Sequence, residues 1–152
     1  MSSKNNQELR PLVRVLTEDL EGNKHAVIAL TKIKGVSYML SNAVLRSLSL
    51  PVNKKIGFFT EEEIQRVEEA IKDPASAGIP SWMFNRRKDL ETGKDLHLIG
   101  ADLNFTKEND IKLLRKIKSY RGLRLSWGLT VRGQRTRSNF RNKKKLLGKK
   151  RK

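Results

Sequence analysis

The fold is decided by the stretch Lys24-His-Ala-Val-Ile-Ala-Leu-Thr-Lys-Ile-Lys-Gly-Val-Ser-Tyr-Met-Leu-Ser-Asn-Ala-Val-Leu-Arg46. Apolar residues at 27, 30 and 33 recur at helical spacing. The helix that they predict ends at Gly35, because glycine readily takes the left-handed conformation found beyond a helix C-terminus. Ser37 can then cap a second helix, over 37–49, with an apolar inner face: Leu40, Val44, Leu45 and Leu48. The stretch therefore predicts a helical hairpin.

The turn of this hairpin resembles the helix–hairpin–helix element, in which backbone N–H groups at a helix N-terminus face a phosphate. The usual second glycine and the usual alanine of that element are Ser37 and Ser41 here. An ordinary helical hairpin explains the same residues equally well, so this stretch alone leaves both readings open. On the first reading Lys34, Gly35 and Ser37 are candidate phosphate-binding residues.

A further helix is predicted over residues 60–72. Thr60 and Glu63 form a capping box, and Phe59 with Ile64 forms a hydrophobic staple. The helix ends before Pro74. Between the two helical segments lies a connection, Pro51 to Gly57, that carries two candidate phosphate-binding lysines, Lys54 and Lys55.

The remaining segments of the body have weaker secondary-structure patterns. Residues 1–9 are polar and expected to be disordered, and a short strand over 12–16 is expected to run into a turn-rich loop over 18–23. After residue 74 we expect a loop, one apolar turn in which Trp82 and Phe84 anchor the chain, and a small hairpin that turns near Gly93. Trp82 is expected in the core rather than as a base-stacking residue.

The last predicted helix runs from its cap at Thr106 to Tyr120. Its apolar residues (Leu113, Leu114, Ile117 and Tyr120) are expected to face inward. Beyond it, glycines at 122, 128 and 133 make a continued helix improbable, so residues 122–152 are predicted to be an extended tail. The tail has too little apolar surface to fold alone and is expected to be unstructured until it binds.

The net charge of +17 comes entirely from the C-terminal part of the chain. Residues 1–110 hold 16 acidic and 16 basic residues, whereas residues 111–152 hold 17 Lys and Arg and no acidic residue. A neutral body with a long tail of one sign is typical of a protein that binds a polyanion, nucleic acid above all. Arginine predominates at 121–141 and suits bidentate phosphate contacts, while lysine predominates from 143 onward.

Several classes of protein are disfavoured by composition. The chain has no cysteine and two isolated histidines, so we expect no disulfide, no metal site and no cofactor. No catalytic set of side chains is recognisable, and an enzyme is not expected. No run of 18 apolar residues and no signal peptide is visible, which predicts a cytoplasmic protein without a membrane partner.

One family shares these motifs. The stretch Tyr120-Arg-Gly-Leu-Arg124, followed by Gly128-Leu129 and Val131-Arg-Gly-Gln-Arg-Thr-Arg137, resembles the signature of a small-subunit ribosomal protein family called S-thirteen in bacteria and S-eighteen in eukaryotes. Ile33-Lys-Gly-Val36 is similar to the family's N-terminal helical motif. Ile79-Pro-Ser-Trp-Met-Phe-Asn-Arg-Arg-Lys-Asp89 with Glu91-Thr-Gly93 resembles an insert of archaeal and eukaryotic members. The resemblance covers residues 10–142.

The resemblance implies a place in the head of the small subunit. The body would bind small-subunit rRNA, and the tail would run toward the tRNA of the peptidyl site. It further implies protein S-nineteen as a neighbour, and bridges to the large subunit through its rRNA and its protein L-five. The implied rRNA-binding residues are Lys34, Gly35, Ser37, Lys54, Lys55, Arg86, Arg87, Lys116, Arg121, Gly122, Arg124, Arg132, Gly133, Gln134, Arg135, Thr136, Arg137 and Arg141; the implied tRNA-binding residues are Lys149, Lys150, Arg151 and Lys152.

The sequence departs from the family at three places. Leu125-Ser-Trp127 replaces a segment that usually carries histidine and further cations, and Thr130 replaces a common proline. The end of the chain, from Phe140, follows no family pattern closely.

The alternative function is a helix–hairpin–helix DNA-binding protein that grips duplex DNA through the Gly35 turn, but that reading leaves the Arg-Gly-Gln-Arg order unexplained.

Taken together, these features predict a mainly α-helical protein. It would consist of a disordered N-terminus (1–9) and a globular body of helical hairpins (10–105), of the helix–hairpin–helix or helix–two-turns–helix kind. The body would carry a small β-hairpin insert at 74–105. A basic helix (106–121) and an extended RNA-binding tail (122–152) would follow.

Overall fold

An antiparallel hairpin of two short strands begins the described part of the chain, β1 (Leu12–Val15) and β2 (Glu18–Glu21). The computed structural model describes residues 9–137. Val13 pairs with Leu20, and both side chains are buried, as the two-residue alternation of a strand requires. The second strand was predicted to be a loop, because Glu18 and Asp19 are poor strand formers. It forms because Leu20 joins the core.

The helical hairpin comes next and confirms the prediction from its sequence. α1 (Ala26–Leu30) and α2 (Tyr38–Ser47) are joined by a turn in which Gly35 has a φ of +100°. The Ser37 side chain caps α2 by accepting a hydrogen bond from the Leu40 N–H at 3.3 Å. The first helix is shorter than its apolar pattern suggested, but Ile33, beyond its end, is still buried.

α3 (Glu61–Lys72) follows the 3₁₀ turn η1 (Ile56–Phe58) and has the predicted capping box. Thr60 Oγ1 accepts from the Glu63 N–H, and Glu63 Oε2 accepts from the Thr60 N–H at 2.9 Å. On its acidic face, Glu68 accepts a hydrogen bond at 2.7 Å from the N–H of Leu16 in the β1–β2 turn. This helix therefore ties the strand hairpin to the body.

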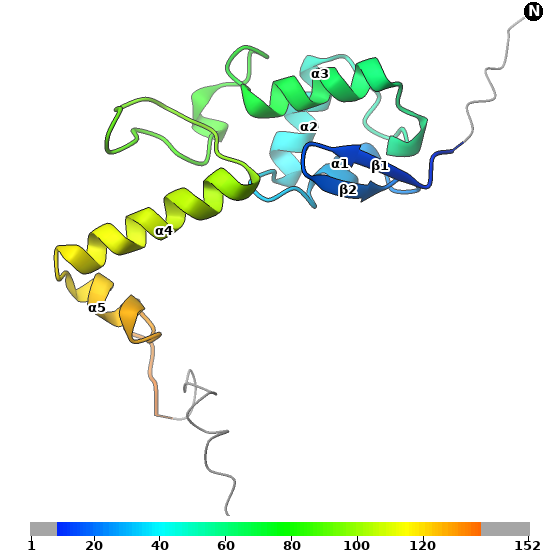
Figure 1. Ribbon diagram of the computed structural model, residues 1–152. Coiled ribbons are helices and arrows are strands. Elements are labelled where there is room, and N and C mark those ends of the chain that lie inside the picture. The colour runs from blue at the N-terminus through cyan, green and yellow to red at the C-terminus, as the bar shows by residue number, and fades with distance from the viewer. Residues whose placement is uncertain (1–8, 138–152) are drawn as a thin grey trace, which may run out of the picture. The chain divides into compact units, whose positions relative to one another are not determined.

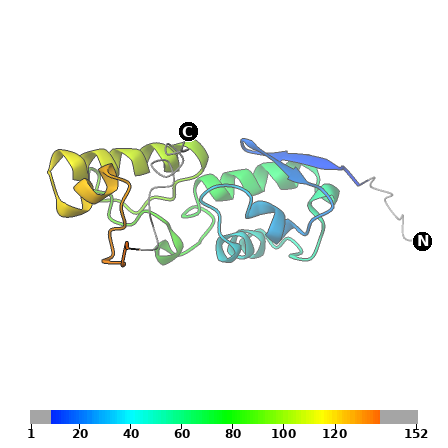
Figure 2. The same cartoon turned by 90° about the horizontal axis from the view of Figure 1, so that it is seen from below.

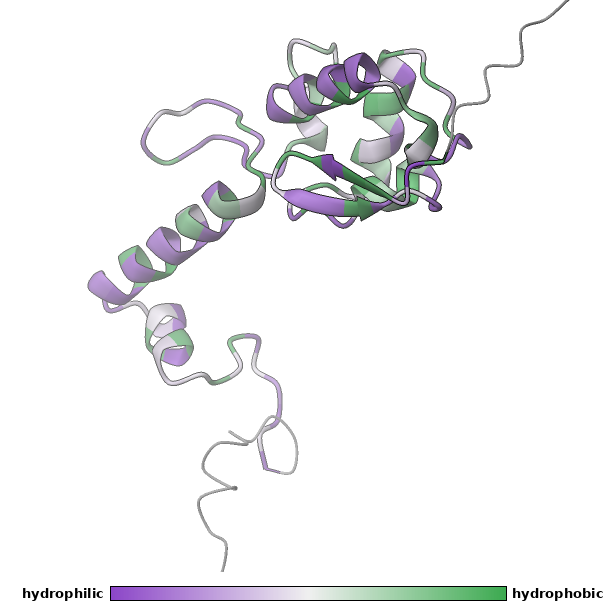
Figure 3. Ribbon diagram, turned by 45° about the vertical axis from the view of Figure 1, so that its right-hand side comes forward, coloured by the Kyte–Doolittle hydropathy of each residue, from purple (hydrophilic) through white to green (hydrophobic). Residues whose placement is uncertain are grey.

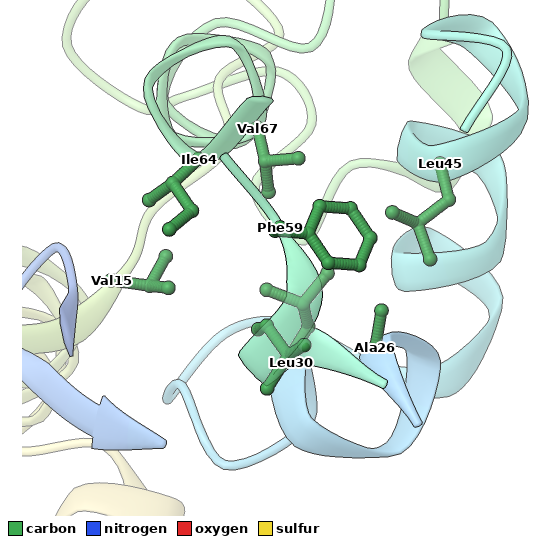
Figure 4. Close-up of a pocket in the computed structure, with 8 residues that line it drawn as sticks. Val15, Ala26, Leu30, Leu45, Phe59, Ile64 and Val67 are labelled. Carbon is green, nitrogen blue, oxygen red and sulfur yellow. The ribbon is translucent and has the colours of Figure 1, made fainter. Parts of the chain in front are cut away.

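The core lies where the β1–β2 hairpin and the first three helices meet (Figures 1 and 2). Figure 4 shows the Phe59 ring between Leu45 of α2 and Val67 of α3, with Ala26 and Leu30 of α1 beside it. All five side chains are buried. Burial of such side chains supplies the main driving force for folding, so this part of the chain has the core of a stable domain.

The insert follows α3 and contains the short 3₁₀ helix η2 (Ser81–Met83). Phe84 is buried, as predicted, but Trp82 is 67% exposed, so its predicted place in the core was wrong. The predicted small hairpin is a loop closed by one antiparallel bridge, in which Arg86 and Leu96 exchange backbone hydrogen bonds of 3.2 and 2.7 Å. Gly93 lies in its turn with a φ of +69°.

Two further helices complete the described residues, α4 (Gly100–Lys116) and α5 (Tyr120–Ser126). α4 begins six residues before the predicted cap at Thr106, because the Gly100 N–H donates to the Lys34 carbonyl and fixes the start there. The chain forms two compact units, divided between Leu103 and Asn104. The prediction of a mainly α-helical fold is confirmed.

Candidate nucleic-acid interface

The Gly35 turn is covered by the chain that leads into α4. A Cβ on Gly35 would lie 2.5 Å from the Leu98 carbonyl oxygen and 3.2 Å from the Ile99 Cα. Gly35 itself is half-buried, and Ser37 uses its side chain as a helix cap. Both predicted phosphate-binding residues therefore have structural roles, and the glycine is required here by close backbone packing. Lys34 remains exposed, and its carbonyl accepts from the Gly100 N–H at 2.9 Å.

The base of the insert holds this packing in place. The Asn85 side chain makes two hydrogen bonds with the Leu98 backbone, donating to its carbonyl at 2.7 Å and accepting from its N–H at 2.9 Å. The rings of Phe84 and His97 meet edge to face with centroids 6.2 Å apart. Burial lowers the pKa of His97, an effect that the neighbouring Gly35 backbone opposes. The His97 ring thus lies beside both Phe84 of the insert and the Gly35 turn.

Two predicted RNA-binding lysines, Lys54 and Lys55, make contacts inside the protein. Lys54 Nζ lies 3.2 Å from Glu63 Oε2 and 4.9 Å from the centre of the Phe59 ring. Lys55 Nζ donates to the side-chain oxygen of Asn23 at 2.6 Å. These contacts place both ammonium groups on the connection to α3, where they stabilise the fold.

The two arginines of the insert differ. Arg86 is half-buried, and its Nε donates to Asp89 Oδ1 at 2.6 Å. Asp89 also accepts hydrogen bonds from the N–H and the hydroxyl of Thr92. Hydrogen bonds from Arg86 and Thr92 lower the pKa of Asp89 to about 2. Arg87, the next residue, is exposed, so it is better placed than Arg86 for an RNA contact.

Because of the Asp89 carboxylate, the stability of the insert should depend on pH in the acidic range. Its folded-state pKa of about 2 lies below the ordinary value of 3.8, so its contribution to stability is full above pH 4 and is lost as pH falls toward 2. We expect the amide proton of Thr92 to shift with a midpoint near 2 in an NMR titration. Asp89→Asn should remove that shift. A midpoint at the ordinary value would show that the Arg86 contact does not form.

α5 packs against the end of α4 (Figures 1 and 2) through Gly122, which the sequence suggested would end the helix. A Cβ on Gly122 would strike the Leu114 carbonyl oxygen, so the glycine is required by the close approach of the two helices. The break occurs instead at Lys118, which has a φ of +55°. Ser119 then caps α5 by accepting from the Gly122 N–H at 3.2 Å.

Arg124 organises the chain that follows α5. Its Nε donates to the Thr130 carbonyl at 2.9 Å and holds that segment against the helix. After it, the Gln134 side chain accepts from the Arg132 N–H at 3.2 Å. The tail was predicted to be extended from residue 122, but α5 continues to Ser126 and these hydrogen bonds give the chain after it local structure.

The exposed cations gather on α4, α5 and the segment after them. Residues 111–137 hold nine Lys and Arg and no acidic residue. Along α4 hydrophilic and hydrophobic residues alternate (Figure 3). The predicted binding residues that are exposed in this region are Lys116, Arg121, Arg132, Gly133, Gln134, Arg135, Thr136 and Arg137. The positive potential around these exposed side chains attracts a polyanion.

The apolar residues of α4 and α5 are less buried than predicted. Ile117 is 64% exposed and Tyr120 is 72% exposed, although both were expected to face inward. Trp127 is 60% exposed. Periodicity could have placed Tyr120 and Trp127 on one helical face if the helix had been continued through Gly122.

The remaining predicted residues, Arg141 and Lys149 to Lys152, lie outside the described residues. Among the helices of the described residues, none is both long and apolar enough to cross a membrane.

Comparison of the sequence with known proteins shows the family to which the chain belongs. A family model described as "Ribosomal protein S13/S18" matches residues 14–142, which include the hairpin, the insert and the α4–α5 region. Small ribosomal subunit protein uS13 of Methanocaldococcus jannaschii is 50% identical over 136 residues, covering 90% of this chain and 91% of that protein. The protein of the same name from Aeropyrum pernix is 49% identical over 130 residues, covering 86% and 87%. The chain belongs to the ribosomal protein S13/S18 family.

Proposed function

We propose that the chain is a structural constituent of the small-subunit head that binds small-subunit rRNA, chiefly through α4, α5 and the basic tail. Its family membership makes it a non-enzymatic component of the ribosome, which works in the cytoplasm. The observation that carries the proposal is the acid-free surface of residues 111–137 with its exposed arginines. Such a surface matches the phosphate backbone of RNA.

The proposal divides the work among the parts of the chain. The body over residues 10–105 supplies a folded platform, with Lys34 and Arg87 as its exposed candidate contacts. The α4–α5 hairpin and residues 132–137 supply most of the phosphate contacts. Gly35, Ser37, Lys54, Lys55 and Arg86 act mainly by holding the platform together, which their hydrogen bonds and packing support.

Finer contacts rest on the family resemblance. The end of the tail would approach the peptidyl-site tRNA, protein S-nineteen would be a neighbour, and large-subunit rRNA and protein L-five would be met across the subunit interface. The charge of residues 143–152, seven Lys and Arg without an acidic residue, supports a contact with RNA at that end.

The alternative, a helix–hairpin–helix DNA-binding protein, requires an accessible Gly35 turn. That turn lies against Leu98 and Ile99, and the Lys34 carbonyl is bonded to the Gly100 N–H. This packing counts against duplex DNA as the ligand of the turn.

The proposal is tested by sedimentation of cell extract through a sucrose gradient. We expect the native protein to travel with small subunits and to be released by RNase. A variant with Arg121, Arg132 and Arg135 replaced by glutamine should leave the subunit at a lower salt concentration than the wild type. Migration at the top of the gradient, or retention that RNase does not change, would contradict an rRNA-binding role.

A further inference from the structure

We propose that Tyr120 and Trp127 form a stacking platform for unpaired RNA bases on the outer face of α5. This inference rests on the RNA-binding function proposed above and names the form of RNA that the region recognises. It assigns a role to two exposed aromatic residues at the two ends of α5.

The first argument is the geometry of the helix. Trp127 is the C-cap of α5 and keeps helical backbone angles (φ −83°, ψ −5°). Tyr120, Arg124 and Trp127 therefore stand at positions i, i+4 and i+7, which share one face of a helix. Gly122 lies on the opposite face, where it is buried against the Leu114 carbonyl. The two aromatic side chains consequently point away from α4.

The second argument is exposure. Tyr120 is 72% and Trp127 is 60% exposed, so a large part of each aromatic side chain is accessible to a ligand. The two residues are seven positions apart along the helix, an axial distance of about 10.5 Å. This is about three times the rise of a stacked nucleotide, so one single strand could place a base on each ring.

The third argument is charge, which favours RNA over a protein partner. Arg124 stands between Tyr120 and Trp127 along the helix, and its Nε donates to the Thr130 carbonyl at 2.9 Å. Arg121, which follows Tyr120 in the helix, is exposed. Aromatic rings interleaved with fixed cations are the arrangement with which proteins bind single-stranded nucleic acid, through stacking and phosphate contacts together. A paired duplex hides its base faces and would use only the cations.

The test uses the full chain with Trp82→Phe, which leaves Trp127 as the one tryptophan of the sequence. A labelled 12-nucleotide oligouridylate and a labelled 12-base-pair RNA duplex are titrated at equal salt. We expect fluorescence anisotropy to show binding of both RNAs, and Trp127 emission to be quenched by the single strand but not by the duplex.

Variants then separate stacking from charge. Trp127→Ala should weaken oligouridylate binding by about 5- to 150-fold, with no change in the salt dependence because no cation is removed. Trp127→Phe should retain most of the affinity, whereas Trp127→Leu, which keeps apolar area without a ring, should not. Trp82→Ala, at the other exposed tryptophan, is the matched control and should bind as the wild type does.

The outcomes distinguish this inference from the function on which it rests. Binding of both RNAs with unchanged Trp127 emission and undiminished affinity in Trp127→Ala would overturn the stacking platform and leave RNA binding intact. Failure of the wild type to bind either RNA would overturn both proposals.

Discussion

Replacing Gly35 by alanine is expected to destabilise the protein by about 2 to 6 kcal/mol, enough to unfold many small domains. Two effects add. A φ of +100° is strained for a residue with a Cβ, at about 1 to 3 kcal/mol. The new methyl group would also lie 2.5 Å from the Leu98 carbonyl oxygen, and relieving such an overlap costs about 1 to 3 kcal/mol. Urea unfolding followed by far-ultraviolet circular dichroism measures the destabilisation.

Gly78→Ala is the matched control for this change. Gly78 also has a positive φ, +74°, but a Cβ there would meet nothing within 4 Å. This variant should therefore show only the effect of strain, about 1 to 2 kcal/mol. If both variants were destabilised by the same amount, the close packing of the insert on the hairpin turn would not contribute. The size of the difference between them measures how firmly residues 98–100 are held against the hairpin.

Local signals were sufficient for the helices of the body. Ser37 and Thr60 each satisfy a backbone N–H within three residues, so the start of α2 and of α3 was visible in the sequence. Apolar spacing then identified their buried faces. Both the signal and the structure that it specifies lie within a few residues, which is why these predictions are confirmed.

Close approaches between segments that are distant in the sequence could not be predicted from such local signals. Gly35 and Gly122 were read as a helix end and a helix breaker, but each is needed because another part of the backbone lies where a Cβ would be. The sequence does not show which segment will come near. The positive φ of Lys118, which actually ends the preceding helical run, has no sequence signal, because lysine seldom takes that conformation.

The sequence predicted which segment of the chain carries the positive charge of the candidate interface, but not which of its residues are exposed. The acid-free stretch after Asp110 identified the region, since charge can be counted without a structure. The role of each cation depends on the partner that folding brings near it. Lys54 forms an ion pair with Glu63, and Arg86 forms one with Asp89. Arg87 is exposed. Which basic residues remain available to RNA therefore follows only from the fold.

Truncation after Val131 is expected to reduce affinity for RNA strongly while leaving the fold unchanged. It removes 11 of the 33 Lys and Arg but none of the described helices or strands. Removing one phosphate-binding cation lowers the slope of log K against log salt by about 0.9 for a duplex or 0.7 for a single strand. If half of the removed cations bind phosphate, the slope should fall by about 4. Truncation after Asn142 is the matched control, because it removes seven of the 11 and keeps Arg132 to Arg141.

The same pair of truncations tests whether the tail reaches tRNA. If α4, α5 and the body are enough to place the protein, small subunits reconstituted with either truncated chain should contain it in full amount. Removal of residues 143–152 should then speed the dissociation of peptidyl-site tRNA, and removal of residues 132–142 as well should speed it further, because fewer cations would face the tRNA phosphates. The measurement is the rate at which labelled tRNA leaves subunits that carry the full-length or a truncated chain. Equal rates at equal occupancy would exclude a tRNA contact by the tail and leave its cations as an anchor on rRNA.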